Sequence, residues 1–261
     1  MITPLQLSSR LAALRTDPSL AGLARSLDVY YGDAARDAAM DRLYGTLVRP
    51  GDLAFDIGSH VGDRIGAFRR CGGRVVALEP QPDCARIVRV LYAGDDAVTL
   101  IESACGAEPG RLSLHINSAN PTVTTASRAF VQAADGAGGW EGQVWDRAID
   151  VPVTTLDALI AAYGMPAFVK IDVEGFEADV LAGLSRPVPA LSFEFTTIQR
   201  DVALRCLDLL AALGAYRFDV ALGETQQLTF GDWRSKDQMA AHIIDLPHAA
   251  NSGDIYAVLH V

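Results

Sequence analysis

The sequence has little cysteine and no long apolar run. Its four cysteines form no C-x-x-C pair and have no histidine partners at zinc spacing; they are Cys71, Cys84, Cys105 and Cys206. Unpaired thiols are typical of a reducing compartment. Nowhere do about 18 apolar residues follow one another, and the N-terminus lacks the compact apolar stretch of a signal peptide. We therefore predict a cytoplasmic protein without a membrane span.

Basic residues are also in short supply. The 261 residues include 22 Lys and Arg against 32 Asp and Glu, which gives a formal net charge of -10. A nucleic-acid backbone or an anionic membrane would be repelled over most of such a surface, so neither is expected as the main partner. Half of the residues are hydrophobic, which is enough to bury the core of one α/β domain, with or without an appendage.

The chain divides into a helical start and a longer part in which strands and helices alternate. Up to residue 50, leucines recur at three- and four-residue intervals or small multiples of them, which predicts an amphipathic helical cap over residues 1–50. These leucines are Leu11, Leu14, Leu20, Leu23 and Leu27. They could cover the chain's own sheet or pair with a second copy, so the oligomeric state stays open.

From residue 51 to residue 261, apolar strands such as LAFDI, RVVALEP, FVKIDV and LSFEF alternate with helical stretches. Strands that are apolar throughout and are followed by helices are typical of a mostly parallel sheet covered on both faces. A hairpin-like return from YRFDVAL to the final DIYAVLHV predicts that the last strand is antiparallel. The fold class is therefore α/β, a three-layer sandwich.

The alternation fails between residues 104 and 169. RLSLHIN alternates like an extra strand, whereas NSANPTVTTASRAF and a glycine-rich tract predict an irregular, lid-like insertion near residues 117–150. Its hydroxyl and amide side chains suit a polyol, and Trp140 and Trp145 could stack on a sugar face. An ordinary surface loop is the alternative interpretation.

The turn FDIGSHVG after the first strand is not a phosphate site. The dinucleotide fingerprint G-x-G-x-x-G fails because its second and third glycine positions hold His60 and Asp63. A phosphate loop needs Lys and Ser or Thr after its last glycine, but Asp63 and Arg64 follow Gly62. Asp56 would also repel an anionic ligand at this turn. A ligand with positive charge fits this turn, unless Asp56 only caps a helix.

A second acid, Glu79, ends the strand RVVALEP twenty-three positions after Asp56. An acid at the tip of the second strand, about 20 residues beyond a glycine turn, is placed to accept two ribose hydroxyls. An adenosine without phosphate and with a cationic end is S-adenosylmethionine, which we predict as the cofactor. The alternative is that Glu79 lies on a solvated strand end.

FVKIDVEGFE places Lys170, Asp172 and Glu174 on one side of a buried strand by alternation. Asp172 is the best candidate for contact with the transferred methyl group and its acceptor, and Lys170 is expected to neutralise a neighbouring carboxylate. Glu194, at the tip of LSFEF, could join Asp172 and Glu174 in a Mg²⁺ site, although nothing in the spacing requires a metal. Glu177 could simply be solvated.

Four stretches together resemble the FkbM-type S-adenosylmethionine-dependent methyltransferases, from about Leu53 to Leu184. FDIGSHVG is similar to the family's D-x-G-A-N-x-G turn, with Ser59 and His60 in place of Ala and Asn. VVALEP resembles its second-strand acid and VPVTTLDALI its T-L-D helix start. The most specific stretch, FVKIDVEGFEADVLAGL, resembles its K-I-D-V-E-G-x-E-x-x-V-L-x-G segment. The resemblance implies a class I methyltransferase (Rossmann-like) fold with a seven-stranded sheet, and O-methylation of a sugar or natural-product hydroxyl.

We therefore expect an O-methyltransferase that acts on a small-molecule or glycan acceptor with hydroxyl groups. Predicted cofactor contacts come from Asp56, Gly58, Ser59, His60, Gly62, Glu79, Ser103 and Asp172. The predicted catalytic residues are Asp172, Glu174 and His60, with His115 as a further base to test, and no residue is assigned to a metal. Two alternatives stay open, a non-catalytic protein that binds S-adenosylmethionine or S-adenosylhomocysteine and a nucleotide-dependent oxidoreductase.

Overall fold

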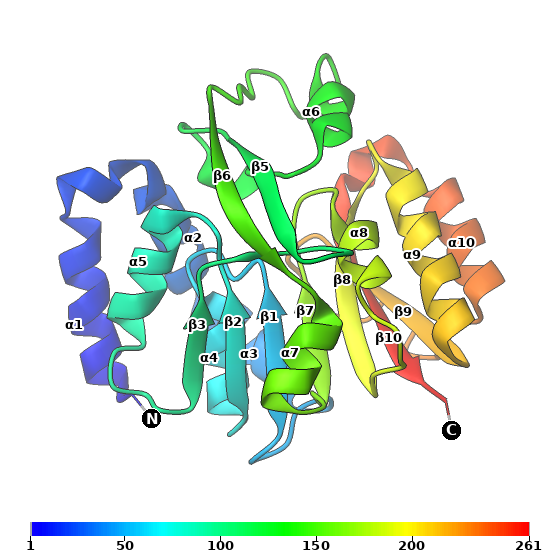
Figure 1. Ribbon diagram of the computed structural model, residues 1–261, viewed down its shortest axis with the longest axis horizontal. Helices are drawn as coiled ribbons and strands as arrows, with labels where there is room; N and C mark the ends of the chain where they lie inside the picture. Colours follow the sequence, from blue (N-terminus) through cyan, green and yellow to red (C-terminus); the bar gives the residue numbers. More distant parts are fainter. Residues whose placement is uncertain (1, 261) are drawn as a thin grey trace.

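The computed structural model describes residues 2–260 and contains two sheets of unequal size (Figure 1). Residue 1, where the predicted helical cap begins, and residue 261, where the longer predicted part ends, lie outside the described residues. The larger sheet has seven strands in the order β3-β2-β1-β7-β8-β10-β9. Its strands are β1 (Leu53–Ile57), β2 (Arg74–Leu78), β3 (Val98–Ile101), β7 (Phe168–Ile171), β8 (Ala190–Thr196), β9 (Tyr216–Leu222) and β10 (Ser252–Leu259).

The direction of the strands confirms the predicted class I methyltransferase (Rossmann-like) fold. β1 pairs in parallel with β2 and β7, β2 with β3, and β7 with β8. The last strand, β10, is antiparallel to both of its neighbours, β8 and β9, and lies between them. The return from β9 therefore inserts the final strand into the sheet.

Helices cover both faces of this sheet and complete three layers (Figure 1). Alternation along β1 sends Phe55 and Ile57 into one core and Ala54 into the other. The first core is closed by α7 (Leu156–Tyr163), α8 (Glu177–Ala182), α9 (Arg200–Leu213) and α10 (Lys236–Asp245). The second core is closed by α1 (Pro4–Arg15), α2 (Ala24–Tyr31), α3 (Ala34–Tyr44), α4 (Asp63–Arg70) and α5 (Pro82–Leu91), together with the short 3-10 helix η1 (Pro18–Leu23).

The N-terminal leucine stripe covers the chain's own sheet. All five leucines of the stripe are buried in the core that α4 and α5 also enter. A capping box between Thr3 and Gln6 starts α1. Arg10 ties α1 to the end of α5 through hydrogen bonds to the carbonyl oxygens of Leu91 and Ala93. The structure therefore supports the interpretation that the stripe covers the chain's own sheet.

The second sheet stands above the carboxyl edge of the first (Figure 1). It contains β4 (Ala104–Cys105), β6 (Arg147–Thr154) and β5 (Gly110–Ile116), in the order β4-β6-β5. The expected extra strand over RLSLHIN is β5. The expectation of a wholly irregular stretch after it was wrong, because residues 128–134 form α6 (Arg128–Ala134) and residues 147–154 form β6. No helix within residues 2–260 is long and apolar enough to cross a membrane.

Candidate active site

A cavity opens where β1, β2, β7 and β8 end, at the point where the strand order reverses between β1 and β7. Open α/β sheets bind their ligands at this place. The space inside it measures about 980 Å³ when the open solvent at its mouth is included. It is lined by all the predicted catalytic residues and by the predicted cofactor residues Asp56, Gly58, Ser59, His60, Glu79, Ser103 and Asp172.

Asp56 is the most isolated acid in the cavity wall. It lies in β1, is 1% exposed, and its Oδ2 has no hydrogen-bond partner among the described residues. Burial, and then the negative charge of Asp63, raise the pKa of Asp56 to about 7. It is not a helix cap, because Gly62 precedes α4 and no side chain caps that helix. A buried carboxylate without a partner is costly, which is why this group tends to keep its proton in the absence of a partner.

Packing alone requires glycine at both glycine positions of the turn. Gly58 has φ +83°, and a Cβ there would lie 1.9 Å from the carbonyl oxygen of Asp172. The contact with the backbone just after β7 therefore requires glycine at this position. Gly62 has φ +86° and is not a lining residue; a Cβ there would meet Tyr92 at 3.0 Å and Val88 at 3.2 Å, on the side of α5.

Glu79 follows β2 directly and is 2% exposed, so it is not a solvated strand end. Its Oε2 accepts a hydrogen bond from the N–H of His60, and its Oε1 accepts one from the N–H of Gln81, both at 2.7 Å. Burial raises the pKa of Glu79 to about 8 although these two hydrogen bonds lower it. Each oxygen keeps a lone pair for a further donor, because a carboxylate accepts about four hydrogen bonds.

His60 forms the wall between the turn and the polar loop. It has φ +46°, its Nδ1 lies 3.5 Å from Cys84 Sγ, and its Nε2 lies 3.5 Å from Thr122 Oγ1. Burial lowers the pKa of His60 to about 4, so its ring is neutral at physiological pH. A neutral imidazole with so low a pKa is a weak base, but it can still donate or accept one hydrogen bond.

Ser103 and Ser59 present hydroxyl groups that are bonded to the backbone. Ser103 Oγ donates toward the carbonyl oxygens of Ala104 and Pro152, each at 2.9 Å, and Ser59 Oγ donates to the Leu78 carbonyl at 3.3 Å. Both side chains are buried and line the cavity. Their oxygens keep lone pairs, so either can accept a hydrogen bond from a ligand amino group.

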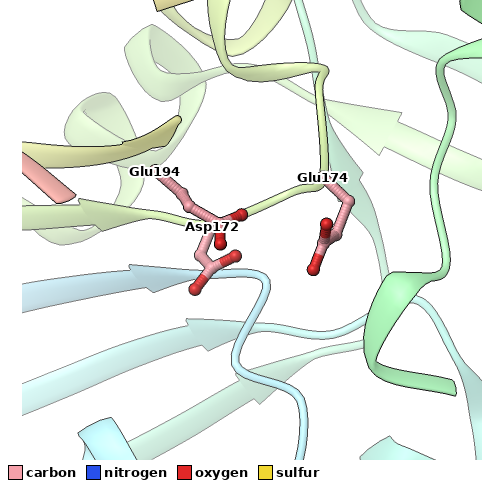
Figure 2. A group of neighbouring side chains, drawn as sticks. All are labelled: Asp172, Glu174 and Glu194. Atoms are coloured by element: carbon pink, nitrogen blue, oxygen red, sulfur yellow. The ribbon is translucent and has the colours of Figure 1, made fainter. Parts of the chain in front are cut away.

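An acidic cluster lies at the ends of β7 and β8 (Figure 2). One carboxylate oxygen each from Asp172, Glu174 and Glu194 lies within 4.8 Å of the other two. Lys170, 1% exposed, ion-pairs with Asp172 at 3.0 Å and with Asp254 at 2.9 Å. The predicted neutralising role of Lys170 is therefore seen directly.

The members of this cluster have different pKa values because their surroundings differ. Burial acts to raise the pKa of Asp172, but the charge of Lys170 and a hydrogen bond with Glu194 outweigh burial and lower it. Burial and the charge of Asp172 raise the pKa of Glu174 and of Glu194 well above the usual value. Asp172 is therefore ionised at neutral pH.

Glu177 has a structural place in the loop that carries Glu174. It is 1% exposed, so the alternative of a solvated Glu177 was wrong. Its Oε1 accepts hydrogen bonds from the N–H groups of Val173 at 3.1 Å and Gly175 at 3.2 Å. These bonds hold the turn after β7, in which Glu174 has φ +55° and Gly175 has φ +85°.

The polar segment 121–127 closes the cavity from above. Thr124 Oγ1 donates to Gln81 Oε1 at 3.0 Å, and Thr125 Oγ1 donates to the Glu174 carbonyl at 2.6 Å. The segment therefore links the cofactor side of the cavity, at Gln81, to the acidic cluster. Thr122 and Thr124 line the cavity.

Trp140 and Trp145 do not lie where a sugar could stack on them. Both rings pack edge-on against Phe130, and neither tryptophan lines the cavity. The expectation that they contact the acceptor was wrong, because the insertion has a small apolar core of its own that takes up both rings. His115 is also absent from the lining; its backbone pairs with Thr125 instead.

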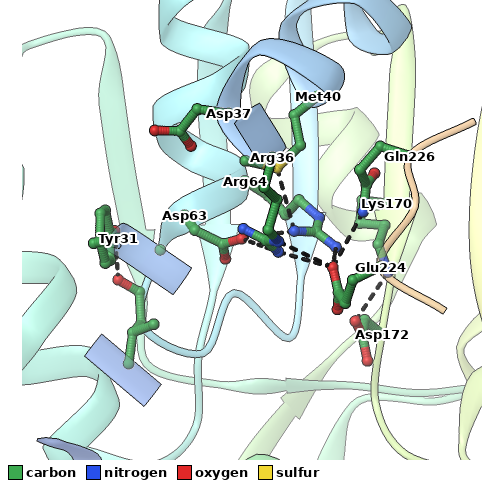
Figure 3. Close-up of polar contacts among 12 residues, drawn as sticks. Tyr31, Arg36, Asp37, Met40, Asp63, Arg64, Lys170, Asp172, Glu224 and Gln226 are labelled. Carbon is green, nitrogen blue, oxygen red and sulfur yellow. Dashed lines mark hydrogen bonds and ion pairs between the residues drawn. The ribbon is translucent and has the colours of Figure 1, made fainter. Parts of the chain in front are cut away.

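Sequence reasoning missed one wall of the cavity, an ion-pair network between α3, α4 and the loop after β9 (Figure 3). Asp63 accepts from Arg36 at 2.8 Å and from Arg64 at 2.6 Å, and Glu224 accepts from the same two arginines at 2.9 and 3.1 Å. Burial acts to raise the pKa of Glu224, but Arg64 and Arg36 outweigh it and lower the pKa to about 2. Tyr30 lies beside this network, with the Arg36 guanidinium 4.9 Å from its ring centre. The sequence signal was the pair Asp63-Arg64, which had served only to exclude a phosphate loop.

Comparison with known proteins gives one family match. The family model described as methyltransferase FkbM domain matches residues 56–219, well over half of the chain. No curated protein matches this chain.

Solved structures that match include three methyltransferases. A precorrin-6y C5,15-methyltransferase from Geobacter metallireducens is 14% identical, with a TM-score of 0.44 over 86% of this chain and 87% of that one. An O-methyltransferase from Bacillus cereus in complex with SAH is 14% identical, with a TM-score of 0.47 over 100% of this chain and 93% of that one. A TehB-like SAM-dependent methyltransferase from Corynebacterium glutamicum is 10% identical, with a TM-score of 0.46 over 99% of this chain and 100% of that one.

Proposed function

Because this chain belongs to the FkbM methyltransferase family, we propose that it transfers the methyl group of S-adenosylmethionine to a hydroxyl group on a sugar or natural product. The observation that carries the proposal is the unpartnered, buried Oδ2 of Asp56 beside the Glu79 carboxylate in one cavity. A nucleoside with a cationic end satisfies both acids. A pyrophosphate would meet negative charge at the same place.

The residues of the cofactor side fit S-adenosylmethionine. Glu79 would accept the ribose hydroxyls with its remaining lone pairs, Asp56 would face the cationic methionine end, and Ser103 would accept from the adenine amino group. When bound, S-adenosylmethionine supplies a methyl carbon activated by its sulfonium, so that a C–O bond forms as the S–C bond breaks with its electron pair left on sulfur.

On the acceptor side, Asp172 would orient the hydroxyl and take its proton. A sugar hydroxyl is a weak acid, so the reaction needs a base near the oxygen, and a positioned base contributes about 10² to 10⁴ in rate. Asp172 is the member of the acidic cluster that Lys170 keeps ionised. Glu174, also in the cavity wall, would hold a second acceptor hydroxyl.

The acceptor class follows from the polar wall. Thr122, Thr124, Asp172, Glu174 and Glu194 all line the cavity and offer oxygen acceptors and hydroxyl donors. A small molecule or glycan with several hydroxyl groups can satisfy such a wall, whereas an apolar acceptor would leave it unpaired. The cysteines form no disulfide, which fits the proposed cytoplasmic location.

Calorimetry and a methyl-transfer assay test the proposal together. S-Adenosylhomocysteine should bind and NAD should not, and Glu79→Ala should remove most of the affinity. Labelled S-adenosylmethionine should then methylate one member of a panel of polyols and glycosides. Asp172→Asn should lower kcat by about 10² to 10⁴, while Asp96→Asn, at the surface, leaves it unchanged.

The outcomes separate the three candidate functions. Binding of S-adenosylhomocysteine without transfer to any acceptor would favour a non-catalytic sensor, and binding of NAD would favour an oxidoreductase. Wild-type turnover by Asp172→Asn would remove that residue from the mechanism.

A further inference from the structure

The cluster of Asp172, Glu174 and Glu194 brings carboxylates from separate segments to one point. Asp172 follows β7, Glu174 lies two residues farther in the turn before α8, and Glu194 lies in the neighbouring strand β8. One oxygen from each lies within 4.8 Å of the other two, and Figure 2 shows the three side chains at the ends of their strands. The same residues line the active-site cavity, so the space is open to a ligand.

Carboxyl groups outnumber basic groups at this point. Among the described residues, Lys170 is the basic side chain that ion-pairs with the cluster, and it divides its contact between Asp172 and Asp254. Four carboxyl groups thus share one ammonium group. Glu174 is buried and Asp172 and Glu194 are partly buried, and carboxylates taken out of water are stable when they are paired, protonated or bound to a metal.

Glu174 gives an independent sign that a ligand belongs here. Its residue is 8% exposed, and within residues 2–260 no hydrogen bond or ion pair reaches its carboxylate. Only its backbone is held, through Thr125 and the turn that Glu177 stabilises. The fold therefore fixes the backbone of Glu174 and leaves its carboxylate free to face the cavity.

From this geometry we infer that Asp172, Glu174 and Glu194 bind a divalent cation, Mg²⁺ or Mn²⁺, which holds the acceptor hydroxyl during methyl transfer. Three carboxylate oxygens with room for waters or a substrate oxygen are the ligands that these hard cations prefer. A +2 charge also offsets more of the negative cluster than the single charge of an ammonium group on an acceptor would.

This inference rests on the proposed function and changes the role of Asp172 in it. Asp172, Glu174 and Glu194 would together hold the cation, so Asp172 would act as a ligand instead of as the base. The cation would supply Lewis acidity that makes the acceptor O–H group more acidic, and the proton would pass to water as the C–O bond forms and the S–C bond breaks.

Manganese binding can be measured apart from activity. The signal of free Mn²⁺ in electron paramagnetic resonance is followed while the full chain is titrated with Mn²⁺, in the presence and absence of S-adenosylhomocysteine. We expect one Mn²⁺ per chain, displaced by Mg²⁺. Glu174→Gln and Glu194→Gln should each weaken binding at least about tenfold. Glu108→Gln, an exposed glutamate with the same change of charge, is the matched control and should bind as the wild type does.

Thermal unfolding in EDTA checks that the variants fold. Removing one negative charge from the cluster relieves repulsion, so neither glutamine variant should be less stable than the wild type without metal. Equal Mn²⁺ affinity in wild type, Glu174→Gln and Glu194→Gln would overturn the inference by placing the metal elsewhere.

Absence of Mn²⁺ binding to wild type that still binds S-adenosylhomocysteine would overturn it too, and binding of glucosamine in that case would assign the cluster to an ammonium group. If the wild-type protein does not bind S-adenosylhomocysteine, the proposed function itself is refuted.

Discussion

At pH 8, replacing Asp56 by asparagine should make the protein more stable and its cofactor affinity weaker. Asp56 is 1% exposed and its pKa is about 7 in the folded chain, against an ordinary value of 3.8. A carboxylic acid with a raised pKa holds its proton in the folded state at pH values where the unfolded chain has lost it. Stability is therefore lost as the pH rises from about 4 to about 7.

The magnitude follows from the shift of roughly three pKa units, each about 1.36 kcal/mol. The ionised Asp56 thus lowers the free energy of unfolding at pH 8 by about 4 kcal/mol. Asparagine removes that term but leaves a buried amide without a partner, which costs about 1 to 3 kcal/mol at any pH. The difference in the free energy of unfolding between the variant and the wild type should therefore increase in the variant's favour by about 2 to 3 kcal/mol as the pH rises from 5 to 8. This corresponds to roughly 5 to 10 °C in the difference in Tm.

Thermal unfolding of the ligand-free protein at several pH values measures this difference. Asp96→Asn, an exposed aspartate, is the control and should follow the wild type throughout. Calorimetry at pH 8 should show that Asp56→Asn binds S-adenosylhomocysteine about ten- to a hundredfold more weakly, the worth of one charge-assisted hydrogen bond. A difference in Tm that does not change with pH would refute the reasoning, because Asp56 would then ionise at an ordinary pH.

Two further substitutions test the packing beneath the site. Gly58→Ala should unfold the turn and abolish S-adenosylhomocysteine binding, since its Cβ would lie 1.9 Å from the Asp172 carbonyl oxygen; Gly94→Ala, also at positive φ but in open space, should only lower Tm slightly. Lys170→Met should lower the free energy of unfolding in urea by about 3 to 5 kcal/mol, because Asp172 and Asp254 lose their buried partner. An Asp254→Asn change in the same background should recover part of this loss, and no recovery would show that Lys170 stabilises the fold in another way.

The sheet could be predicted from the sequence because its strands are buried on both faces. LAFDI, RVVAL, FVKI and ALSFEFT are apolar runs between clear turn signals, and each of them is a strand in the structure. β6 was missed because RAIDVPVT includes charged residues and a proline, and because it pairs at long range with GRLSLHI. Its register depends on tertiary contacts that no local pattern contains.

Some of the residues that line the candidate site could also be predicted from the sequence. Asp56, Glu79 and Asp172 could be found because each stands at or next to the end of a buried strand, where an ionisable group is rare. Arg36 and Glu224 could not, because they come from α3 and from the loop after β9, and 188 residues separate them in the chain. Likewise, Asp254 meets Lys170 only because β10 is inserted between β8 and β9.

The two groups of charges around the cavity differ in a way that locates the ligands. In the network of Figure 3, two arginines face Asp63 and Glu224, so the protein balances its own charges and this wall is scaffold. Elsewhere in the cavity wall, no hydrogen bond or ion pair within residues 2–260 reaches the Oδ2 of Asp56 or the carboxylate of Glu174. Such groups either keep their protons or are completed by a bound molecule. The positive charge missing there is therefore expected from the methyl donor at Asp56 and from a cation at Glu174, and both should raise Tm when they bind.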